Sequence, residues 1–555
     1  MNEIELDQTK RKSRSGIVGW ILGTLSLIGI VAARMTAPDA DHALANILTV
    51  GLGILAWAFI VFALIAGGTF RVAGIALFLA PAVAMIALIT CFRFERLDAE
   101  LVPQFSWRFA KDSELQEVDS NADAGDAIFV ARETDFPQFL GPDRDGVINA
   151  AIEADWNTNP PEIIWKKSIG EGWSGFAIQG DVAITMEQRD ESEWVSAYSV
   201  QDGSIIWKYE NAAVHTTVPG GLGPRSTPTI ADGKVYACSA VDNLICLDLV
   251  SGEKVWSQDL LALAETSQAD FEAGVAWGRS ASPLVVGSLV VIPLGGQGDL
   301  ASTLIAFDAA TGEEKWRSGQ GQAGYSSPVA LTLDGVQQIV LVSEARVAGY
   351  DIESGEQLWE SDWPGKSSAD PAVAHPIQIS DTQLLLAKGY SEGSQLLEIS
   401  QAASNPGSWQ TKEIWRSKRV MKTKFTTAVV LDDYAYGLSD GILECIEVAT
   451  GERQWKRGRY RHGQLLLLGD KLLILAESGN LVLVEATPDK YEELASIPVI
   501  TNVSWNTLAI SGNRLLVRNS DEAAMVKLPL LNTQSPSTSN TSETAGPTTE
   551  NGDAS

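Results

Sequence analysis

Hydrophobic residues recur along most of this chain in short runs that alternate with polar residues, and many of these runs end on a tryptophan. The most regular stretch is eleven residues long, with a small residue first, Gly seventh and Trp eleventh. It occurs at 197–207, 246–256, 306–316, 349–359 and 445–455. Alternating apolar positions on either side of a Gly turn predict a β-hairpin in which the Gly takes a positive φ. A hairpin cannot bury an indole alone, so each Trp is expected to pack on the neighbouring unit.

The Gly and Trp of each copy are therefore interpreted as structural residues that turn one hairpin and dock one unit on the next. These positions are Gly203, Trp207, Gly252, Trp256, Gly312, Trp316, Gly355, Trp359, Gly451 and Trp455. A period of roughly 40 to 60 residues, rich in β-branched and aromatic residues, indicates a solenoid or a propeller.

The number of units can be counted in two ways. The first count uses the strands that close the units. Eight such strands are found: one near 485–494 lacks the Trp, and the other seven end at Trp165, Trp207, Trp256, Trp316, Trp359, Trp415 and Trp455. The second count uses the short apolar strands that open the units, and it also gives eight. The strand around Trp165 precedes the first opening, and it completes the last unit if the chain closes into a ring without exposed sheet edges. Residues 131–530 are thus predicted to form an all-β, eight-bladed β-propeller, with seven blades as the alternative.

Longer apolar runs precede the repeats, at 16–33, 44–66 and 72–92. Each has about 18 residues or more without an internal charge, which predicts three transmembrane helices. A cleaved signal peptide is the alternative for the first run, because basic residues at 10–14 precede it, but two further spans follow directly.

The basic cluster before the first span predicts that residues 1–15 are cytoplasmic. An odd number of spans then places the remainder of the chain on the extracytoplasmic side of the inner membrane. Arg93 and Arg96, on that outer side, depart mildly from the positive-inside rule.

Charge excludes one class of partner. The sequence has 41 Lys and Arg against 70 Asp and Glu, a formal net charge of −29, which repels nucleic-acid phosphates. Residues 93–130 are polar and acidic and are predicted to be a spacer, and residues 531–555 are predicted to be a disordered tail. Cys238 and Cys246 could face each other across a hairpin as a disulfide, but Cys246 occupies the small first position of the repeat, which favours a core residue.

The pattern small-x-Asp-x-x-Thr/Ser-Gly-x-x-x-Trp, with its Asp at Asp248, Asp308 and Asp351, resembles the tryptophan-docking repeat of the PQQ-like (pyrroloquinoline quinone) propeller family. That repeat occurs in quinoprotein alcohol dehydrogenases and in outer-membrane assembly factors of the BamB type. The resemblance covers about residues 135–530. The segment at 136–146, Phe-Pro-Gln-Phe-Leu-Gly-Pro-Asp-Arg-Asp-Gly, also resembles a segment of membrane-anchored PQQ-like repeat proteins of planctomycete-type bacteria, which implies a cell-envelope setting.

The dehydrogenase branch of this resemblance implies a PQQ stacked between a Trp and a vicinal Cys-Cys disulfide, with a Ca²⁺ bound by Glu, Asn and Asp. The sequence has no Cys-Cys pair, and its four His are isolated. Glu187 and Asp299 are available carboxylates, but no oxygen-ligand set can be assigned. Nucleophile-elbow, phosphate-loop and zinc-helix motifs are also missing. No catalytic residue and no metal ligand is predicted, and PQQ with calcium is kept only as an alternative cofactor.

The residues that start the inner strands form the candidate ligand site, because a ring gathers them at one mouth of its central channel. Basic forks would bind carboxylates there, and Trp or Tyr faces would bind rings. The alternative is that these side chains pair with neighbouring acids and pack the channel end. The candidates are Trp173, Arg225, Arg279, Tyr325, Lys424 and His462.

Together these features predict a membrane-anchored, extracytoplasmic propeller that acts as a non-catalytic binding or scaffold module of the cell envelope. Envelope proteins are its expected partners, with a BamB-like role in protein assembly as the resemblance implies. The alternative is a PQQ- or quinone-dependent oxidoreductase with its site at the channel mouth.

Overall fold

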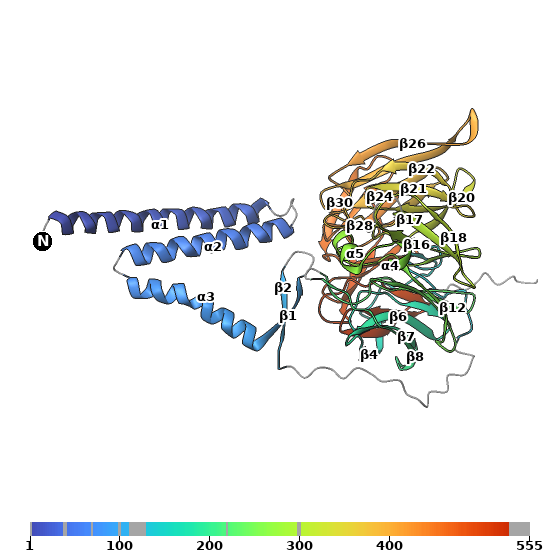
Figure 1. The fold of residues 1–555 in the computed structure, drawn as a ribbon, viewed down its shortest axis with the longest axis horizontal. Helices are drawn as coiled ribbons and strands as arrows, with labels where there is room; N and C mark the ends of the chain where they lie inside the picture. The colour runs from blue at the N-terminus through green and yellow to red at the C-terminus, as the bar shows by residue number, and fades with distance from the viewer. Residues whose placement is uncertain are drawn as a thin grey trace, which may run out of the picture.

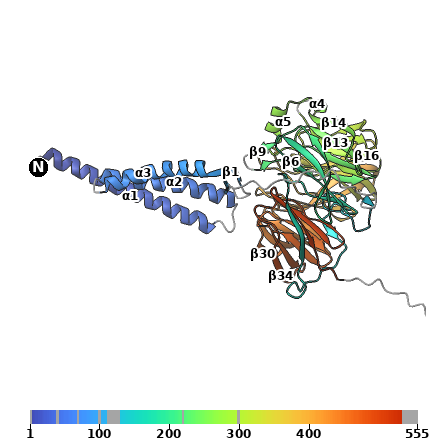
Figure 2. The ribbon, with the colours of Figure 1, turned by 90° about the horizontal axis from the view of Figure 1, so that it is seen from below.

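The computed structural model describes residues 3–36, 42–67, 70–97, 102–109, 129–217, 220–296 and 301–531. Three long helices lie to one side of a large β-propeller (Figures 1 and 2). The predicted tail lies outside the described residues except for Leu531, and so does much of the predicted spacer. The described part of that spacer departs from the prediction, because β1 (Phe92–Leu97) and β2 (Pro103–Trp107) form an antiparallel hairpin there.

The helices are α1 (Glu3–Thr36), α2 (His42–Gly67) and α3 (Arg71–Cys91). Their apolar stretches, 16–35, 45–66 and 71–91, have mean hydropathies of 2.1 to 2.6 and are long enough to cross a membrane. Helices α1 and α2 pack closely at Gly19, where a Cβ would lie 2.9 Å from the carbonyl oxygen of Phe59.

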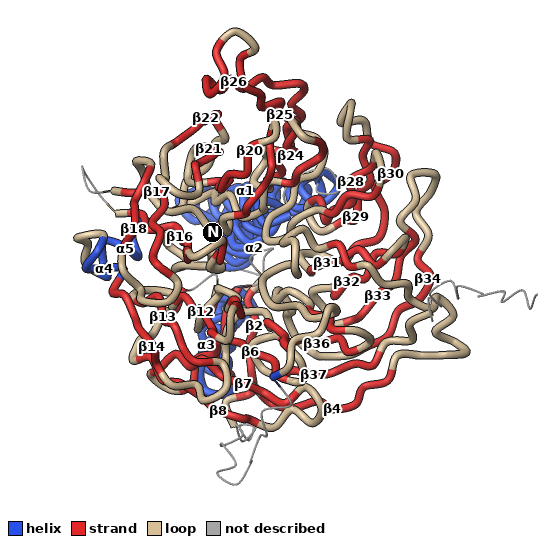
Figure 3. The backbone as a smooth tube through the Cα atoms, turned by 90° about the vertical axis from the view of Figure 1, so that its right-hand side faces the viewer, coloured by secondary structure: helices blue, strands red, loops and turns tan. Residues whose placement is uncertain are grey.

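Eight antiparallel sheets surround the central channel, which confirms the predicted fold and blade number (Figure 3). From inner to outer strand, blade 1 is β5 (Ala177–Gln179), β6 (Val182–Arg189), β7 (Ser192–Ser199) and β8 (Ile205–Asn211); blade 2 is β11 (Thr229–Ala231), β12 (Lys234–Cys238), β13 (Asn243–Asp248) and β14 (Lys254–Asp259); blade 3 is β15 (Leu284–Val286), β16 (Leu289–Gly295), β17 (Ser302–Asp308) and β18 (Glu314–Ser318); blade 4 is β19 (Val329–Leu333), β20 (Val336–Val342), β21 (Arg346–Asp351) and β22 (Gln357–Asp362).

The second half of the ring repeats this order. Blade 5 is β23 (Ile377–Ser380), β24 (Gln383–Lys388), β25 (Gly393–Ala402) and β26 (Asn405–Ser417); blade 6 is β27 (Val429–Leu431), β28 (Tyr434–Ser439), β29 (Ile442–Glu447) and β30 (Arg453–Arg459); blade 7 is β31 (Gln464–Leu468), β32 (Lys471–Leu475), β33 (Asn480–Glu485) and β34 (Glu493–Pro498); blade 8 is β35 (Ala509–Ser511), β36 (Arg514–Arg518), β37 (Glu522–Lys527) and β4 (Glu162–Ser168). Two short helices, α4 (Leu260–Leu263) and α5 (Gln268–Gly274), and the two-stranded β9 (Thr216–Thr217) and β10 (Gly221–Leu222) lie between blades.

Blade 8 takes its outer strand from the other end of the propeller sequence. Strand β4 pairs antiparallel with β37, with Trp165 opposite Met525. This is the ring closure that the sequence predicts, and it leaves the last blade without an unpaired edge at that point.

Each blade has a β-bulge at the same place, between its third and fourth strands and next to the residue that opposes the tryptophan position. In blade 2, for example, Cys246 opposes Trp256 and the register shifts at Leu247. Cys238 instead opposes Leu244, and both cysteines are free and buried in the core. The possible disulfide between them is therefore not formed.

The repeat tryptophans join neighbouring blades. Trp207 Nε1 donates to Leu249 O at 3.0 Å, and Trp256 Nε1 donates to Ala309 O at 3.1 Å. Trp165, Trp316, Trp415 and Trp455 make the same type of bond to the next blade. Trp359 is different, because its Nε1 donates to Gln338 Oε1 of its own blade while the ring packs in the core that blades 4 and 5 share.

The repeat glycines lie under these indoles. Gly252 has a φ of 70°, and a Cβ there would lie 2.5 Å from the ring of Trp207. Gly203, Gly312, Gly355 and Gly451 meet the Trp of the preceding docking copy in the same way. The Gly and the Trp of the repeat are thus two halves of one contact between blades.

This contact gives a prediction for Gly252→Ala, with Gly233→Ala as its matched control. Both glycines have φ near 70°, but a Cβ at Gly233 meets nothing within 4 Å. The control should cost about 1 kcal/mol through the backbone alone, and Gly252→Ala about 1–3 kcal/mol more through overpacking against Trp207. Thermal unfolding of the full chain in detergent measures the difference. Equal losses in the two variants would show that the indole contact carries no stability.

The segment before the first blade crosses the central channel, and we call residues 136–148 the plug segment. Phe136 bridges to Ile178 of blade 1, and Pro137 O accepts a hydrogen bond from Ile230 N in blade 2. Its other end, β3 (Val147–Ile148), pairs in parallel with β31 of blade 7. The plug segment therefore contacts blades 1 and 2 at one end and blade 7 at the other.

Candidate functional site

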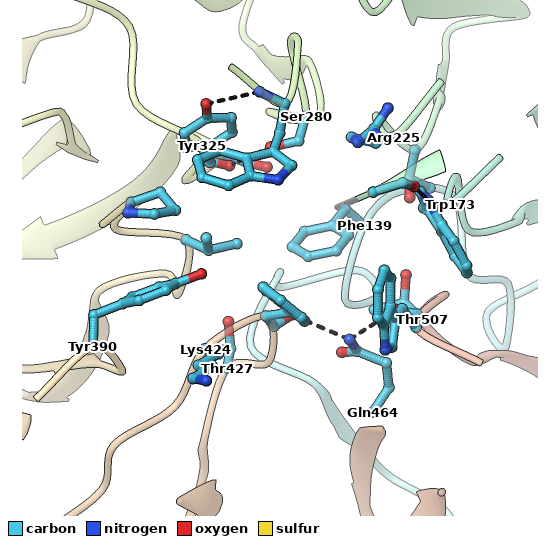
Figure 4. Close-up of a pocket in the computed structure, with 18 of the residues that line it drawn as sticks. Phe139, Trp173, Arg225, Ser280, Tyr325, Tyr390, Lys424, Thr427, Gln464 and Thr507 are labelled. Carbon is cyan, nitrogen blue, oxygen red and sulfur yellow. Dashed lines mark hydrogen bonds between the residues drawn. The ribbon is translucent and has the colours of Figure 1, made fainter. Parts of the chain in front are cut away.

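A cavity of about 370 Å³ lies in the central channel, on the side where the inner strands begin (Figure 4). Seven aromatic side chains line it: Phe139, Trp173, Trp277, Tyr325, Tyr390, Phe425 and Trp505. Arg225 and Lys424 supply the cationic groups, and Thr, Ser and Gln side chains supply most of the neutral polar atoms. The described residues of the lining include no Asp, Glu, His or Cys.

Hydrogen bonds and ring contacts fix the aromatic walls. Trp173 Nε1 donates to Gly220 O at 2.6 Å, and its ring lies 4.6 Å from that of Trp505. On the other side, the Trp277 backbone N–H donates to the Tyr325 hydroxyl at 3.2 Å. Gln464 Nε2 donates to the backbone oxygens of Phe425 and Trp505. Because both partners of each contact line the cavity or border it, the site is preorganised.

The two cationic groups lie on opposite sides of the cavity (Figure 4). Arg225 Nη1 donates to Gly223 O at 2.6 Å, which holds the guanidinium at the mouth. Burial lowers the pKa of Arg225 to about 10, so the group is still charged at neutral pH. Lys424 Nζ lies 5.5 Å from the centre of the Tyr390 ring, within cation–π range.

The structure brings four of the six candidate residues to this cavity: Trp173, Arg225, Tyr325 and Lys424. Arg279 and His462 do not line it. Arg279 is 4% exposed, donates to Val241 O, Pro293 O and Leu294 O, and stacks at 4.4 Å on Phe271 of α5. The His462 ring is buried behind Phe425, 5.6 Å away, and its backbone N–H donates to Glu477.

Other lining residues were not candidates in the sequence. Tyr390 comes from the turn between β24 and β25 in blade 5, where no repeat position marks it. Phe139 comes from the plug segment and lies 5.0 Å from His375. Phe425 and Trp505 lie within or beside strands that are predicted to open a unit. That position in the ring was the signal that could have identified them as lining residues.

A buried arginine is linked to the cavity lining through Ser282, whose hydroxyl accepts the N–H of the lining residue Thr227. Arg144 of the plug segment donates to Ser282 O and Pro283 O of blade 3, and burial lowers its pKa to about 9. Burial, and then the charge of Arg144, lower the pKa of His375 to about 3. No salt bridge joins Arg144 to a carboxylate in the described part of the chain. Its positive charge therefore adds to those of Arg225 and Lys424 around the cavity.

Glu193 of β7 interacts electrostatically with Arg225 of the cavity lining. Its side chain is fully buried and accepts the Ala240 N–H at 3.2 Å. Burial raises the pKa of Glu193 to about 7, although Ser239, the Ala240 N–H and the charge of Arg225 act against the shift. The folded protein therefore holds this proton more tightly than the unfolded chain, whose carboxyl titrates near its ordinary value of 4.5.

A pH-dependent stability follows for Glu193→Gln. The wild type loses stability as pH rises from about 4.5 to 7, because the buried carboxyl ionises in that range, by about 3 kcal/mol in total. The variant keeps an oxygen acceptor for Ala240 and lacks this loss, so its advantage over the wild type should be absent near pH 4 and largest near pH 8. Thermal midpoints between pH 4 and 8 measure it; a difference that does not change with pH contradicts the assignment.

A calcium–PQQ pair does not fit the cavity lining. Calcium requires several oxygen ligands, usually carboxylates, and the described lining has no carboxylate. Of the two carboxylates considered in the sequence, Glu187 is fully buried against Arg189, and Asp299 lies outside the described residues. Nowhere in the described chain do three or more His, Cys, Asp or Glu groups gather as a metal site.

Known proteins share this fold and repeat. A PQQ-type family model, described as outer membrane protein assembly factor BamB, matches residues 191–457. BamB of Shewanella oneidensis is 23% identical over 58% of this chain and 78% of that protein, and BamB of Bordetella pertussis is 25% identical over 48% and 63%. The crystal structure of quinohemoprotein alcohol dehydrogenase from Comamonas testosteroni has a TM-score of 0.51 at 14% identity, covering 72% of this chain and 81% of that one. The likeness to this enzyme shows the fold alone.

Proposed function

Because this chain carries a PQQ-like β-propeller of the BamB type, we propose that it is a non-catalytic binding or scaffold module of the cell envelope. Three apolar helices anchor it in the inner membrane, and the propeller lies on the extracytoplasmic side. The observation that carries this proposal is the cavity lining, which combines aromatic faces with the cationic groups of Arg225 and Lys424, a set suited to binding an anion.

The ligand of this cavity is an organic anion with a planar aromatic body. Aromatic faces stack on rings, and guanidinium and ammonium groups bind carboxylate or sulfonate oxygens. The protein as a whole carries a net charge of −29, so a cavity lined by Arg225 and Lys424 is a local exception that selects anions. The partners of the module are envelope proteins, as the BamB relatives suggest, and they would contact the loops around the ring.

Membrane topology tests the anchoring part of this proposal. In a Cys91→Ser background, a membrane-impermeant maleimide added to intact spheroplasts should label Lys254→Cys, an exposed position on β14. It should label Ser13→Cys, before the first span, only after lysis. Labelling of Ser13→Cys alone in intact cells would invert the topology and exclude an extracytoplasmic propeller.

Cross-linking in the membrane tests the scaffold part. Purification of the cross-linked full chain should recover proteins of the envelope, and a propeller-free bait of residues 1–97 should not. Recovery of the same proteins by both baits would assign the interaction to the helices and contradict a role for the propeller.

One other function is considered, a quinone-dependent oxidoreductase, because the aromatic faces of the lining suit a planar ring. Aromatic walls with Arg225 and Lys424 would hold a planar polyanion, but the described lining has no carboxylate to bind its calcium. Addition of PQQ with Ca²⁺ to the purified full chain is therefore expected to give no calcium-dependent shift of the thermal midpoint and no calcium-dependent change in PQQ absorbance. A calcium-dependent shift would favour the oxidoreductase.

A further inference from the structure

The hairpin of β1 and β2 follows the third apolar helix without a break. Strand β1 begins at Phe92, directly after Cys91 ends α3, and the Arg108 N–H after β2 donates to Cys91 O at 2.9 Å. Both ends of the hairpin are thus tied to the end of α3. In Figures 1 and 2 the hairpin lies between the helices and the propeller.

One face of this hairpin is aromatic and uncovered. Its residues are Phe92, Phe94, Phe105, Trp107 and the adjoining Phe109, which are 37% to 67% exposed. Cross-strand pairing places Phe92 against Trp107, with ring centres 5.1 Å apart, and Phe94 against Phe105 at 6.0 Å. Phe109 extends the row at 5.8 Å from Trp107.

The alternate positions are polar. Arg93 pairs with Ser106 on the other face of the hairpin, and Arg108 follows Trp107. A two-stranded hairpin is marginal by itself in water, and five clustered aromatic side chains mark an interaction surface. The aromatic face is therefore expected to pack against another molecule.

We propose that the hairpin is an interfacial membrane element whose aromatic face lies in the headgroup layer of the bilayer that α3 crosses. The position of the hairpin indicates that the bilayer covers its aromatic face, because the aromatic row starts one residue after an apolar stretch of membrane-spanning length. Trp and other aromatic side chains favour this layer. Arg93 and Arg108 at alternate positions meet lipid phosphates, which accounts for arginine on the extracytoplasmic side.

This placement also orients the propeller. Strand β1 contacts β10 (Gly221–Leu222), and the neighbouring Gly220 lines the cavity and accepts the Trp173 indole N–H. The hairpin therefore holds the propeller with the mouth of its cavity toward the membrane, so that ligands reach the cavity from the interface. The inference rests on the proposed membrane anchoring.

Lipid quenching of a fluorescent label tests it in the full chain. In a Cys91→Ser background, where the other native cysteines are buried, an environment-sensitive dye is attached to Phe105→Cys on the aromatic face, or to Ser106→Cys on the opposite face. A third label at Val50→Cys, in the second span, and a fourth at Lys254→Cys, on the propeller, serve as controls. All variants are reconstituted in nanodiscs of phosphatidylcholine with nitroxide lipids.

The expected result is quenching at position 105 at least threefold stronger than at position 106, with a nitroxide near the headgroup more effective than one deep in the acyl chain. Position 50 should be quenched best by the deep nitroxide, and position 254 by neither. Two outcomes would overturn the interfacial hairpin and leave the membrane anchoring intact. In both, the label at position 50 is quenched, while the label at position 105 is either not quenched or quenched no more than the label at position 106. No quenching at 50 overturns the anchoring itself. A label at Phe109→Cys repeats the test should substitution at 105 disturb the hairpin.

Discussion

Replacement of Glu187 by Gln is expected to lower the free energy of unfolding by about 3–5 kcal/mol. The Glu187 carboxylate is fully buried, accepts hydrogen bonds from the Tyr198 hydroxyl and the Gly170 N–H, and forms a salt bridge with Arg189 at 3.1 Å. Arg518 of blade 8, also fully buried, donates to Met186 O and Gly170 O beside it. The substitution leaves two buried guanidinium groups without their carboxylate at the junction of blades 1 and 8, where the ring closes.

The pH dependence of this loss has a definite sign. Burial alone would raise the pKa of Glu187, but the charges of Arg189 and Arg518 outweigh it and hold this pKa below its ordinary value. The stabilisation is thus present above the unfolded-state pKa near 4.5 and is lost as pH falls through the folded-state value. Denaturation of wild type and variant at pH 7 and pH 4 measures it. The variant's deficit relative to the wild type should narrow at pH 4, whereas Glu193→Gln should show an advantage over the wild type that grows toward pH 8. A deficit that widens at pH 4 contradicts the ion-pair assignment.

The second large effect concerns the cavity. The double variant Arg225→Met, Lys424→Met is expected to weaken binding of 2-naphthoate by tenfold to a hundredfold, because each charge-assisted hydrogen bond contributes about 1.5–3 kcal/mol and is partly replaced by water. Met keeps much of the apolar volume, so the aromatic walls remain. Isothermal titration of the full chain in nanodiscs measures the dissociation constants.

The neutral isostere 2-naphthamide supplies the control for charge. It should bind the wild type more weakly than 2-naphthoate and bind the double variant about as well as the wild type. Lys412→Met with Lys418→Met, two exposed positions in and beside the outer strand of blade 5, controls for loss of net positive charge. Equal weakening by this second pair would show that general electrostatics, and not the cavity, binds the anion.

The fold could be predicted because the repeat encodes a contact between blades. Gly252 must be a glycine for both its φ and the ring of Trp207, so Gly and Trp recur together and can be counted. Closure by the strand of Trp165 follows from the same count. The hairpin β1–β2 was not found, because acidic residues around it dominate the composition of 93–130.

The site could be predicted only in part, for a reason that two arginines illustrate. Arg225 and Arg279 both precede a serine before an inner strand, yet Arg225 lines the cavity and Arg279 turns toward Phe271 of α5. Helix α5 lies in an insertion between blades 2 and 3, and no repeat predicts where it packs. Phe139 likewise reaches the cavity only because the plug segment crosses the channel.

Photo-cross-linking with 5-azido-2-naphthoate tests the central claim, a binding cavity within the propeller ring, most directly. After illumination of the full chain in nanodiscs, mass spectrometry of the digested protein should locate the adduct on peptides that contain Trp173, Trp277, Phe425 or Trp505. Excess 2-naphthoate should suppress these adducts, and the double variant Arg225→Met, Lys424→Met should lack them. Adducts confined to the outer strands or to the apolar helices, and unaffected by the double variant, would contradict the account.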